Sequence, residues 1–496
     1  MERPSVALET LGCRLNQAES EELARRFVAA GYRLVSPGEG ADVYILNTCT
    51  VTGVADRKAR RWLRWARRCN PSALVVAAGC YAERAASEVS KMPEVNLAVG
   101  NHAKEDLVSL VQERLVSRPP KRLPKSSGFA YPPSYPSPAR GEGTTSSPSS
   151  GEDKGGGEHP SGNATNFRDK TLGTPVGNDG RGPLPPRSRP LVKLQAGCTL
   201  GCTYCIVPRV RGPERSVPAP QVLAQVKTRA AEGYQEVVLT GTLLGAYRWE
   251  GIDLTALLER LLAETPLRQA PSTSSGQRQG TAIGRFRLSS LLPQDLTPTL
   301  LRLWDTGRLC HHLHLPLQSG SPGVLERMRR PYSPAQYEEA VALARRVLAR
   351  GQGPALALTT DVMVGFPGES DEEFEESYRF CQRMDFARIH VFSYSRRPGT
   401  PAAKMPQVGA STMHERARRM LALAGQSVPR FHRRFVGQTL PVLWEEKKDG
   451  VWEGLTDNYL RVFTASSEEL HGRITPARLA APYGEGLWGE TASHVP

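Results

Sequence analysis

Hydrophobic and polar positions follow two alternating patterns through the first 118 residues. Short aliphatic runs occur in "SVALETLGC", "DVYILNTC", "ALVVAAGC" and "VNLAVGN", and such runs are typical of buried parallel strands. Between them, "AESEELARRFVAAGY" and "DRKARRWLRWARRC" carry apolar residues at three- and four-residue steps, which indicates amphipathic helices. Alternating strands and helices predict a small parallel α/β domain over residues 1–118.

The pattern changes at about residue 119. Residues 119–188 are rich in Pro, Gly, Ser and Thr and contain few aliphatic residues, as in "YPPSYPSPARGEGTTSSPSSGEDKGGG". Such a segment cannot bury enough apolar surface to offset its ordering entropy, so we predict a disordered linker. Residues 268–283 include "QAPSTSSGQRQGTA" and are interpreted as a similar low-complexity insertion. Neither segment is expected to carry chemistry.

Strand and helix patterns resume between residues 189 and 428. The strand-like runs read "LVKLQAG", "EVVLTG", "RFRLSS", "HLHLPLQSG", "DVMVGF" and "IHVFSYS", and helical patterns such as "QVLAQVKTRAAEGY" separate them. They predict a partial (β/α)6 barrel. Over residues 429–496, "TLPVLWEE", "GVWEGLTDNYLRVFT" and "HGRITPARLAAP" predict a small antiparallel β-barrel. The predicted fold class is therefore multidomain α/β.

Charge and composition narrow the class of partner. The N-terminus has no signal-like apolar segment and no run approaches the ~18 apolar residues of a membrane span, so we expect a cytoplasmic protein with no membrane partner. The net charge of +14 favours a polyanion, and nucleic acid is favoured over a membrane surface. A basic but inert surface is the alternative.

One predicted helix concentrates this charge. Six arginines recur at three- and four-residue steps of "DRKARRWLRWARR" and share a face: Arg57, Arg60, Arg61, Arg64, Arg67 and Arg68. This face is interpreted as a phosphate contact, with a solvated basic face as the alternative. Trp62 and Trp65 are expected to pack on the sheet.

Cysteine spacing gives the strongest chemical signal. The loop "LQAGCTLGCTYCIVP" places Cys198, Cys202 and Cys205 together without a neighbouring His, Asp or Glu. Three thiolates can hold a [4Fe–4S] cluster and leave its fourth iron open to a ligand, whereas a structural zinc would need a fourth protein ligand. All six runs of the predicted barrel end in Gly, Ser, Thr or Pro, which lets backbone approach a ligand; simple strand termination is the alternative.

Three further cysteines, in the first domain, also lie at the ends of predicted strands. Cys13, Cys49 and Cys80 each follow a predicted strand at its carboxyl end. Because adjacent parallel strands lie ~4.8 Å apart, these thiols are expected to converge on a second cubane. Cys69 follows a helix and is excluded, and we interpret Cys310 and Cys381 as small buried hydrophobic residues. Without a secretion signal, a disulfide framework is not expected.

The three-cysteine loop resembles that of the radical S-adenosylmethionine (SAM) enzymes, in which the open iron chelates SAM. Tyr204 fits the aromatic position that packs near adenine in that family. The resemblance implies SAM contacts on the rim of the barrel, at Gly241, Ser289, Gln318 and Arg215.

Over nearly the whole chain outside the two insertions, the motifs resemble the methylthiotransferases. They are "TLGCRLNQAES", "NTCTVT", "AAGCYAE", "GCTLGCTYCIVPRVRGPERS", "HLHLPLQSGS", "TTDVMVGFPGES" and "HVFSYSRRPGTPAA", and "GLTDNYLRV" resembles the TRAM domain of that family. The sequences of these motifs most resemble those of the subfamily that methylthiolates N6-threonylcarbamoyladenosine next to the anticodon of tRNA, at position 37.

The resemblance also implies a mechanism. The Cys198/Cys202/Cys205 cluster would reduce SAM to release a 5′-deoxyadenosyl radical, which takes hydrogen from adenine C2. The Cys13/Cys49/Cys80 cluster would hold the sulfur that is methylated and transferred. Two [4Fe–4S] clusters and SAM are the implied cofactors, and tRNA, an electron donor and a sulfur source are the implied partners.

The chain departs from the family at two points. Val217 replaces an arginine in "RGPERSVP", while Arg211 and Arg215 match, and Leu291, Leu292 and Pro293 stand where the family usually reads "IEP". Alternative substrates are isopentenyladenosine in tRNA and an aspartate of a small-subunit ribosomal protein. A non-catalytic RNA-binding iron–sulfur protein is the third alternative.

Overall fold

The computed structural model describes residues 3–117, 187–265, 283–350 and 353–491. The predicted linker lies outside the described residues except for Arg187 and Ser188, and the predicted insertion lies outside them except for Ile283. Among the described residues, no helix has both the length and the apolar composition needed to cross a membrane.

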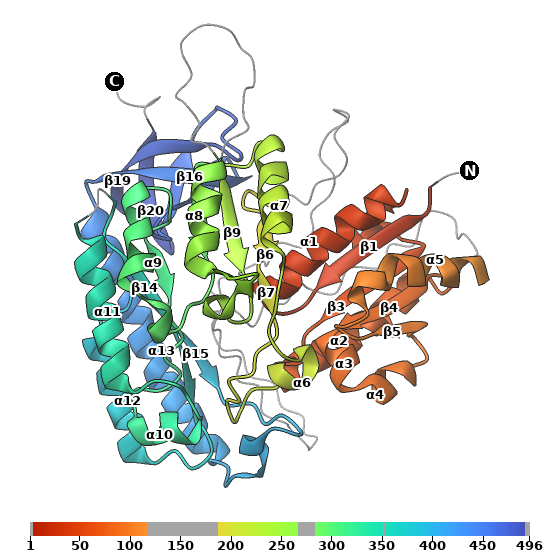
Figure 1. The fold of residues 1–496 in the computed structure, drawn as a ribbon, viewed down its shortest axis with the longest axis horizontal. Helices are drawn as coiled ribbons and strands as arrows, with labels where there is room; N and C mark the ends of the chain where they lie inside the picture. The colour runs from red at the N-terminus through yellow and green to blue at the C-terminus, as the bar shows by residue number, and fades with distance from the viewer. Residues whose placement is uncertain (1–2, 118–186, 266–282, 351–352, 492–496) are drawn as a thin grey trace, which may run out of the picture.

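The N-terminal domain is built on a five-stranded parallel sheet in the order β2-β1-β3-β4-β5 (Figure 1). Its strands are β1 (Ser5–Thr10), β2 (Arg33–Leu34), β3 (Val43–Thr48), β4 (Leu74–Gly79) and β5 (Leu97–Val99). The central strands β3 and β4 are buried along their whole length, which explains their unbroken aliphatic runs. The predicted parallel α/β domain is confirmed.

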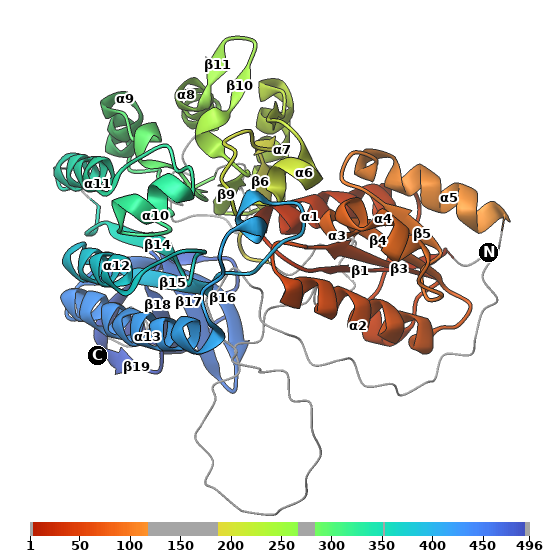
Figure 2. The ribbon, with the colours of Figure 1, turned by 90° about the horizontal axis from the view of Figure 1, so that it is seen from below.

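Helices cover both faces of this sheet (Figure 2). On one face lie α1 (Arg14–Ala29) and α5 (Leu107–Ser117); on the other lies α2 (Gly53–Cys69), and α3 (Cys80–Arg84) and α4 (Ala86–Ser90) follow β4. Trp62 and Trp65 of α2 pack edge-on against Tyr44 of β3, with ring centroids 6.2 and 6.1 Å from the Tyr44 ring. The predicted role of both tryptophans in sheet packing is confirmed.

The central domain is a six-stranded partial barrel, as predicted. Two parallel sheets, β6-β9-β12 and β13-β14-β15, are joined through the bridges Phe286–Leu309 and Ser290–His314. The strands are β6 (Leu191–Lys193), β9 (Glu236–Thr240), β12 (Arg285–Leu288), β13 (His312–His314), β14 (Ala357–Val364) and β15 (Arg388–Ser393).

Helices form the outer layer of this barrel (Figure 2). They are α7 (Ala219–Ala231), α8 (Leu254–Glu264), α9 (Pro298–Arg302), α10 (Pro322–Arg327), α11 (Pro334–Leu348), α12 (Asp371–Arg383) and α13 (Ala410–His432). The short strands β7 (Gln195–Ala196), β8 (Arg215–Ser216), β10 (Arg248–Trp249) and β11 (Ile252–Asp253) and the short helix α6 (Val207–Arg211) lie in its loops.

Alternation along the strands gives the barrel two different faces. Residues such as Leu239, Leu313 and Val362 belong to the hydrophobic core under the helices. Their neighbours in sequence point to the opposite, concave face, which carries charged and polar side chains such as His314 and Asp361. This polar concave face is where a barrel of this kind can receive a polar ligand.

The C-terminal domain is a closed barrel of five strands in the order β16-β17-β18-β20-β19. The strands are β16 (Thr439–Lys448), β17 (Val451–Thr456), β18 (Arg461–Ala465), β19 (Ile474–Tyr483) and β20 (Gly486–Thr491). The prediction of an antiparallel barrel holds for every pair except β18 and β20, which are parallel. A closed ring with an odd number of strands cannot alternate direction throughout, so one pair has to be parallel.

The C-terminal barrel docks on the central domain through buried charges. Arg285 and Arg287 of β12 donate to the carbonyl oxygens of Leu455 at 3.0 Å and Thr456 at 3.1 Å, respectively. Both guanidinium groups also pair with the fully buried Glu236. Since a buried charge is stable only when it is paired, this contact fixes the barrel against the central domain.

Candidate functional site

The N-terminal sheet gathers three cysteines at one edge, and we call Cys13, Cys49 and Cys80 the sheet-edge cysteines. Cys49 directly follows β3, Cys80 directly follows β4, and Cys13 precedes α1 just after β1. These three strands are neighbours in the sheet. Burial raises the pKa of the Cys49 thiol, and the nearby thiols of Cys80 and Cys13 raise it further. The predicted placement at the strand ends is therefore observed.

Gly12 makes room for this arrangement. Its φ is +114°, and a Cβ atom on it would lie 2.6 Å from Cys49 Cβ and 2.9 Å from Cys49 Sγ. Asn16 holds the same turn, because its side-chain amide donates to the carbonyl oxygens of Leu11 at 2.8 Å and Thr48 at 3.0 Å. Any side chain at position 12 would displace the Cys49 thiol.

The second set, which we call the loop cysteines, is Cys198, Cys202 and Cys205. The loop is held by its own backbone: Cys198 N donates to Gly212 O and Cys205 N donates to Cys202 O, both at 3.0 Å. Burial raises the pKa of the Cys205 thiol to about 12, with Cys202 and Cys198 adding to the rise. The three thiols belong to one tight loop of eight residues, as expected of ligands to one cluster.

A partly buried arginine, Arg330, lies beside this loop and carried no signal in the sequence. Arg330 Nη1 donates to Cys202 Sγ at 3.4 Å, and its other nitrogens donate to the Tyr332 hydroxyl at 2.9 and 2.6 Å. Tyr204 packs edge-on against Phe366, with ring centroids 6.5 Å apart. A cation at this position stabilises negative charge on the Cys202 sulfur.

Gln195 connects this loop to the next strand end on the rim. Its Oε1 accepts hydrogen bonds from Thr242 N at 3.1 Å and Leu243 N at 2.9 Å, and its Nε2 donates to Gly197 O at 2.8 Å. Gly241 lies against it, since a Cβ there would be 3.2 Å from Gln195 O. This buried glutamine fixes the relative positions of the loop cysteines and the Gly241 turn.

The predicted SAM contacts lie at strand ends with differing exposure. Ser289 follows β12, Gln318 follows β13 with a φ of 68° and accepts from Met363 N at 2.8 Å, and Arg215 of β8 is exposed. The buried hydroxyls of Ser289 and Thr242 have no hydrogen-bond partner among the described residues. Because buried polar groups need partners, these hydroxyls on the rim fit a polar ligand such as SAM.

One short segment separates the two sets of cysteines. Ile206 follows Cys205 directly, and it shares a hydrophobic cluster with Val210 of α6 and with Cys80. Asn101 Nδ2 donates to Val210 O at 2.6 Å and to Cys80 Sγ at 3.4 Å. Arg211, at the end of α6, forms a buried pair with Glu19 of α1 at 2.7 Å. The two sets therefore lie on either side of residues 206–211.

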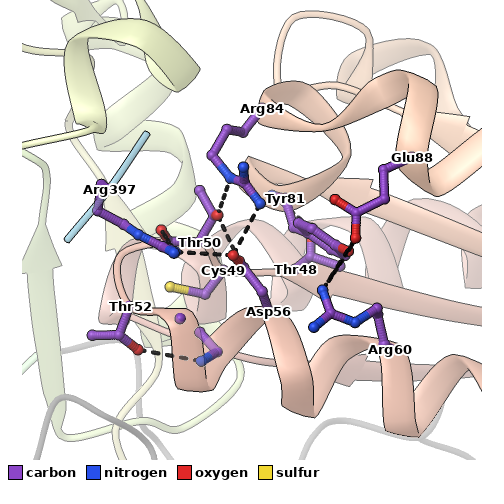
Figure 3. A network of polar contacts seen from close by, with 12 residues as sticks. Thr48, Cys49, Thr50, Thr52, Asp56, Arg60, Tyr81, Arg84, Glu88 and Arg397 are labelled. Atoms are coloured by element: carbon purple, nitrogen blue, oxygen red, sulfur yellow. Dashed lines mark hydrogen bonds and ion pairs between the residues drawn. The ribbon is translucent and has the colours of Figure 1, made fainter. Parts of the chain in front are cut away.

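A second interdomain contact lies beside Cys49 (Figure 3). Asp56 of α2 accepts hydrogen bonds from Arg84 at 2.9 Å, from Thr50 at 2.6 Å and from Arg397 at 2.9 Å. Arg397 comes from the loop after β15 and also donates to Thr50 O at 3.0 Å. The central domain is thus attached one residue away from a sheet-edge cysteine.

The departures from the family pattern occupy packing positions. Leu291 and Leu292 belong to the central hydrophobic core, and Val217 packs against it. Val217 N also donates to Leu194 O at 2.8 Å. These residues contribute apolar contacts rather than polar groups on the rim.

The arginines of the basic face of α2 fall into two groups, one exposed and one hydrogen-bonded within the N-terminal domain. Arg57, Arg61, Arg64 and Arg68 are exposed. Arg60 donates to the Tyr81 hydroxyl at 2.9 Å, and Arg67 donates to Ala73 O at 2.9 Å. The exposed arginines leave a basic stripe on a helix that begins next to Cys49.

Neither set of cysteines resembles a site for one ion. Within the described ranges, no three His, Cys, Asp or Glu side chains converge closely enough to bind a single metal ion. A cubane bonds each thiolate to a different iron rather than gathering three thiolates on one ion. If each set held such a cluster, its three thiolates would leave one iron without a protein ligand.

Comparison with known proteins agrees with this geometry. Residues 192–381 match the Radical SAM superfamily, and residues 5–100 match the Uncharacterized protein family UPF0004. The fold is similar to that of the radical S-adenosylmethionine methyltransferase TsrM from Kitasatospora setae. Its TM-score is 0.52 at 12% identity, and the alignment covers 91% of this chain and 80% of TsrM. The fold and site define a radical SAM enzyme.

Curated relatives specify the family. The chain is 32% identical to "Threonylcarbamoyladenosine tRNA methylthiotransferase MtaB" from Bacillus subtilis, over 97% of this chain and 96% of the relative. It is 35% identical to the protein of the same name from Aquifex aeolicus, over 92% and 96%. It is 30% identical to "tRNA-2-methylthio-N(6)-dimethylallyladenosine synthase" from Syntrophotalea carbinolica, over 98% and 99%.

The chain belongs to the radical SAM methylthiotransferase family. It is an enzyme that transfers a sulfur-containing group, with iron–sulfur and SAM cofactors. The family resemblance expected from the motifs is confirmed.

Proposed function

We propose that this protein methylthiolates C2 of N6-threonylcarbamoyladenosine at position 37 of tRNA. The observation that carries the proposal is the pair of three-cysteine sets on either side of residues 206–211. The similarity to two relatives named threonylcarbamoyladenosine tRNA methylthiotransferase supports the choice of substrate.

We assign one [4Fe–4S] cluster to each set of cysteines. The loop cysteines would hold the cluster that binds SAM, with Tyr204, Gly241, Ser289, Gln318 and Arg215 around the cofactor. The sheet-edge cysteines would hold the second cluster. When bound, these groups supply a 5′-deoxyadenosyl radical that removes hydrogen from adenine C2, and a methylated sulfur that replaces it.

Residues of the chain position and shield this reaction. Arg330 stabilises negative charge beside Cys202, and Gln195 holds the rim at Gly241. The buried pairs Arg211–Glu19 and Arg397–Asp56 hold the N-terminal domain against the barrel. A closed, dry junction limits side reactions of a radical.

The basic charge and the exposed arginines of α2 support tRNA as the partner. The C-terminal barrel is assigned as a TRAM domain that contributes RNA contacts. The proposal includes a cytoplasmic location, a cellular electron donor and a sulfur source. Isopentenyladenosine in tRNA is the second candidate substrate, because a relative named for the dimethylallyl substrate is 30% identical over 98% of the chain.

The test is an anaerobic assay of the purified, reconstituted enzyme with SAM and a reductant. Two otherwise identical tRNAs, bearing threonylcarbamoyl- or isopentenyladenosine, are incubated separately and digested for nucleoside mass spectrometry. We expect the 2-methylthio product from the threonylcarbamoyl substrate. A product from the isopentenyl substrate alone would favour the second candidate, and modification of neither tRNA would overturn the tRNA proposal.

A further inference from the structure

A polar cluster lies where the three domains meet, and one of its members, Arg14, directly follows Cys13. Arg14 of α1 comes from the N-terminal domain and Tyr459 from the C-terminal barrel, and both lie next to residues on the concave face of the central barrel. These residues are His312, His314, Asp361 and His390. Nothing in the assigned cluster or SAM sites uses this group.

Contacts between these side chains fix the cluster. Arg14 Nη2 donates to the Tyr459 hydroxyl at 2.7 Å. The Tyr459 ring packs against His312, with ring centroids 4.7 Å apart. His314 Nε2 lies 3.3 Å from Asp361 Oδ2, and its ring centroid is 5.8 Å from that of His390.

Arg14 supplies positive charge to this concave face. Burial lowers the pKa of His390 to about 3; the carboxylate of Asp361 opposes this shift, while Arg388 and Arg14 add to it. Burial lowers the pKa of His312 as well, with Arg287 and Arg14 contributing. Both of these histidines are therefore neutral, and the guanidinium of Arg14 is the charged donor that the N-terminal domain brings to this face.

We propose that Arg14 binds the carboxylate of the threonylcarbamoyl group and so sets substrate specificity. This inference rests on the proposed function. Arg14 follows Cys13 directly, so a base whose C2 faces the sheet-edge cysteines lies within reach of both. Tyr459 is a positioning residue, because its hydroxyl orients the guanidinium.

The chemistry of the base supports this assignment. In adenine, C2 and C6 flank N1, so a substituent on N6 lies along the same edge as C2. Threonylcarbamoyl ends in a carboxylate, which a planar guanidinium can bind through two parallel hydrogen bonds. An isopentenyl group has no charge or hydrogen-bonding atom to offer. It would desolvate the guanidinium without compensation, so the same residue favours one substrate and disfavours the other.

The test changes the substrate carboxylate and Arg14 separately and together, as in a double-mutant cycle. Steady-state kcat/KM is measured for tRNA bearing N6-threonylcarbamoyladenosine and for the same tRNA with that carboxylate methylated. Wild-type enzyme is expected to prefer the acid by about tenfold to a hundredfold, the range for a hydrogen bond between charged groups. In Arg14→Met the preference should vanish, chiefly through KM for the acid.

Control variants separate recognition from folding. Arg33→Met removes an exposed cation of the same domain and should keep the wild-type preference. Tyr459→Phe should raise KM for the acid several-fold and leave the ester unaffected. A purely structural role of Arg14 would slow both substrates equally.

Several results would overturn the inference. An unchanged acid preference in an Arg14→Met enzyme with normal iron content would do so. If that variant fails to hold its clusters, Arg14→Lys decides: its acid preference must fall below that of wild type, and an unchanged preference counts against Arg14. Wild-type enzyme that leaves the threonylcarbamoyl substrate unmodified would instead contradict the proposed function itself.

Discussion

Arg397 Nη1 of the central barrel donates to Asp56 Oδ2 of the N-terminal domain at 2.9 Å, and both side chains are buried. The same guanidinium donates to Thr50 O, one residue after Cys49. The contact therefore couples the position of the central barrel to the position of a sheet-edge cysteine. In the proposed reaction, transfer of sulfur to a base held in the barrel would depend on that relative position.

Arg397→Met should reduce methylthiolation at least tenfold while 5′-deoxyadenosine formation stays within a few-fold of wild type. Removing one partner of a buried ion pair costs about 3–5 kcal/mol, and Arg84, which still pairs with Asp56, places this variant at the low end. The two products are quantified from one anaerobic reaction. Arg396→Met, which alters the exposed neighbour, is the matched control. Equal loss of both products in Arg397→Met would contradict the coupling.

The two sets of cysteines should have separable roles. Alanine at any loop cysteine should abolish 5′-deoxyadenosine formation, because a cluster held by three thiolates cannot spare one. Alanine at any sheet-edge cysteine should leave that reaction measurable and eliminate the methylthio product. Cys69→Ala should change neither product. Wild-type enzyme should contain about eight irons per chain, and about four would contradict two clusters.

Acid should weaken the contact between α1 and the central domain. Burial alone would raise the pKa of Glu19, but Lys104 at 2.6 Å and Arg211 at 2.7 Å outweigh it and hold the pKa well below its ordinary value. Because the pKa of Glu19 is lower in the folded state, its carboxylate stabilises the fold at pH values above the pKa of Glu in the unfolded chain, about 4.3. This stabilisation is lost as the pH falls below that value. Wild type should therefore melt at a higher temperature than Glu19→Gln at pH 7.

The gap in melting temperature between wild type and Glu19→Gln should narrow as the pH is lowered towards 3. Thermal unfolding followed by circular dichroism checks this trend. Glu22→Gln, an exposed position on the same helix, should show no comparable gap. A gap that stays constant with pH would mean that the carboxylate charge of Glu19 contributes nothing.

The exposed stripe of α2 should contact tRNA phosphate. Alanine at Arg57 and Arg68 together should weaken tRNA binding and lower the slope of log K against log salt, by up to about 0.7–0.9 for each phosphate that the variant no longer binds. Arg346→Ala, an exposed change on α11, is the control. Binding assays at several salt concentrations measure the slope. An unchanged slope in the double variant would mean that these arginines face solvent and do not contact tRNA phosphate.

The positions of the sheet-edge cysteines were predictable from sequence because parallel strands present their carboxyl ends at one edge. The same reasoning excluded Cys69, and Cys310 and Cys381 are buried as expected of small hydrophobic residues. The pairing of β18 with β20 was not predictable in this way. Hydrophobic alternation locates strands along the chain, but it does not determine which strands become neighbours.

The residues that hold the site together carried no local signal. Arg397 meets Asp56 across 341 positions of sequence, and Arg14 meets Tyr459 across 445. In a chain with 64 Lys and Arg residues, such arginines are indistinguishable from surface charge until the fold brings their partners near. Arg330, which is partly buried, and Gln195, which is buried, are similar cases, because their roles come from contacts beside the loop cysteines.

The most direct test of the proposed function is nucleoside mass spectrometry of tRNA from cells with and without this gene. The account predicts that deletion removes 2-methylthio-N6-threonylcarbamoyladenosine and leaves its unthiolated precursor in its place. Restoring the wild-type gene should restore the modified nucleoside, and a sheet-edge cysteine variant should not. Unchanged 2-methylthio-N6-threonylcarbamoyladenosine in the deletion strain, with loss of the isopentenyl counterpart or of neither, would contradict it.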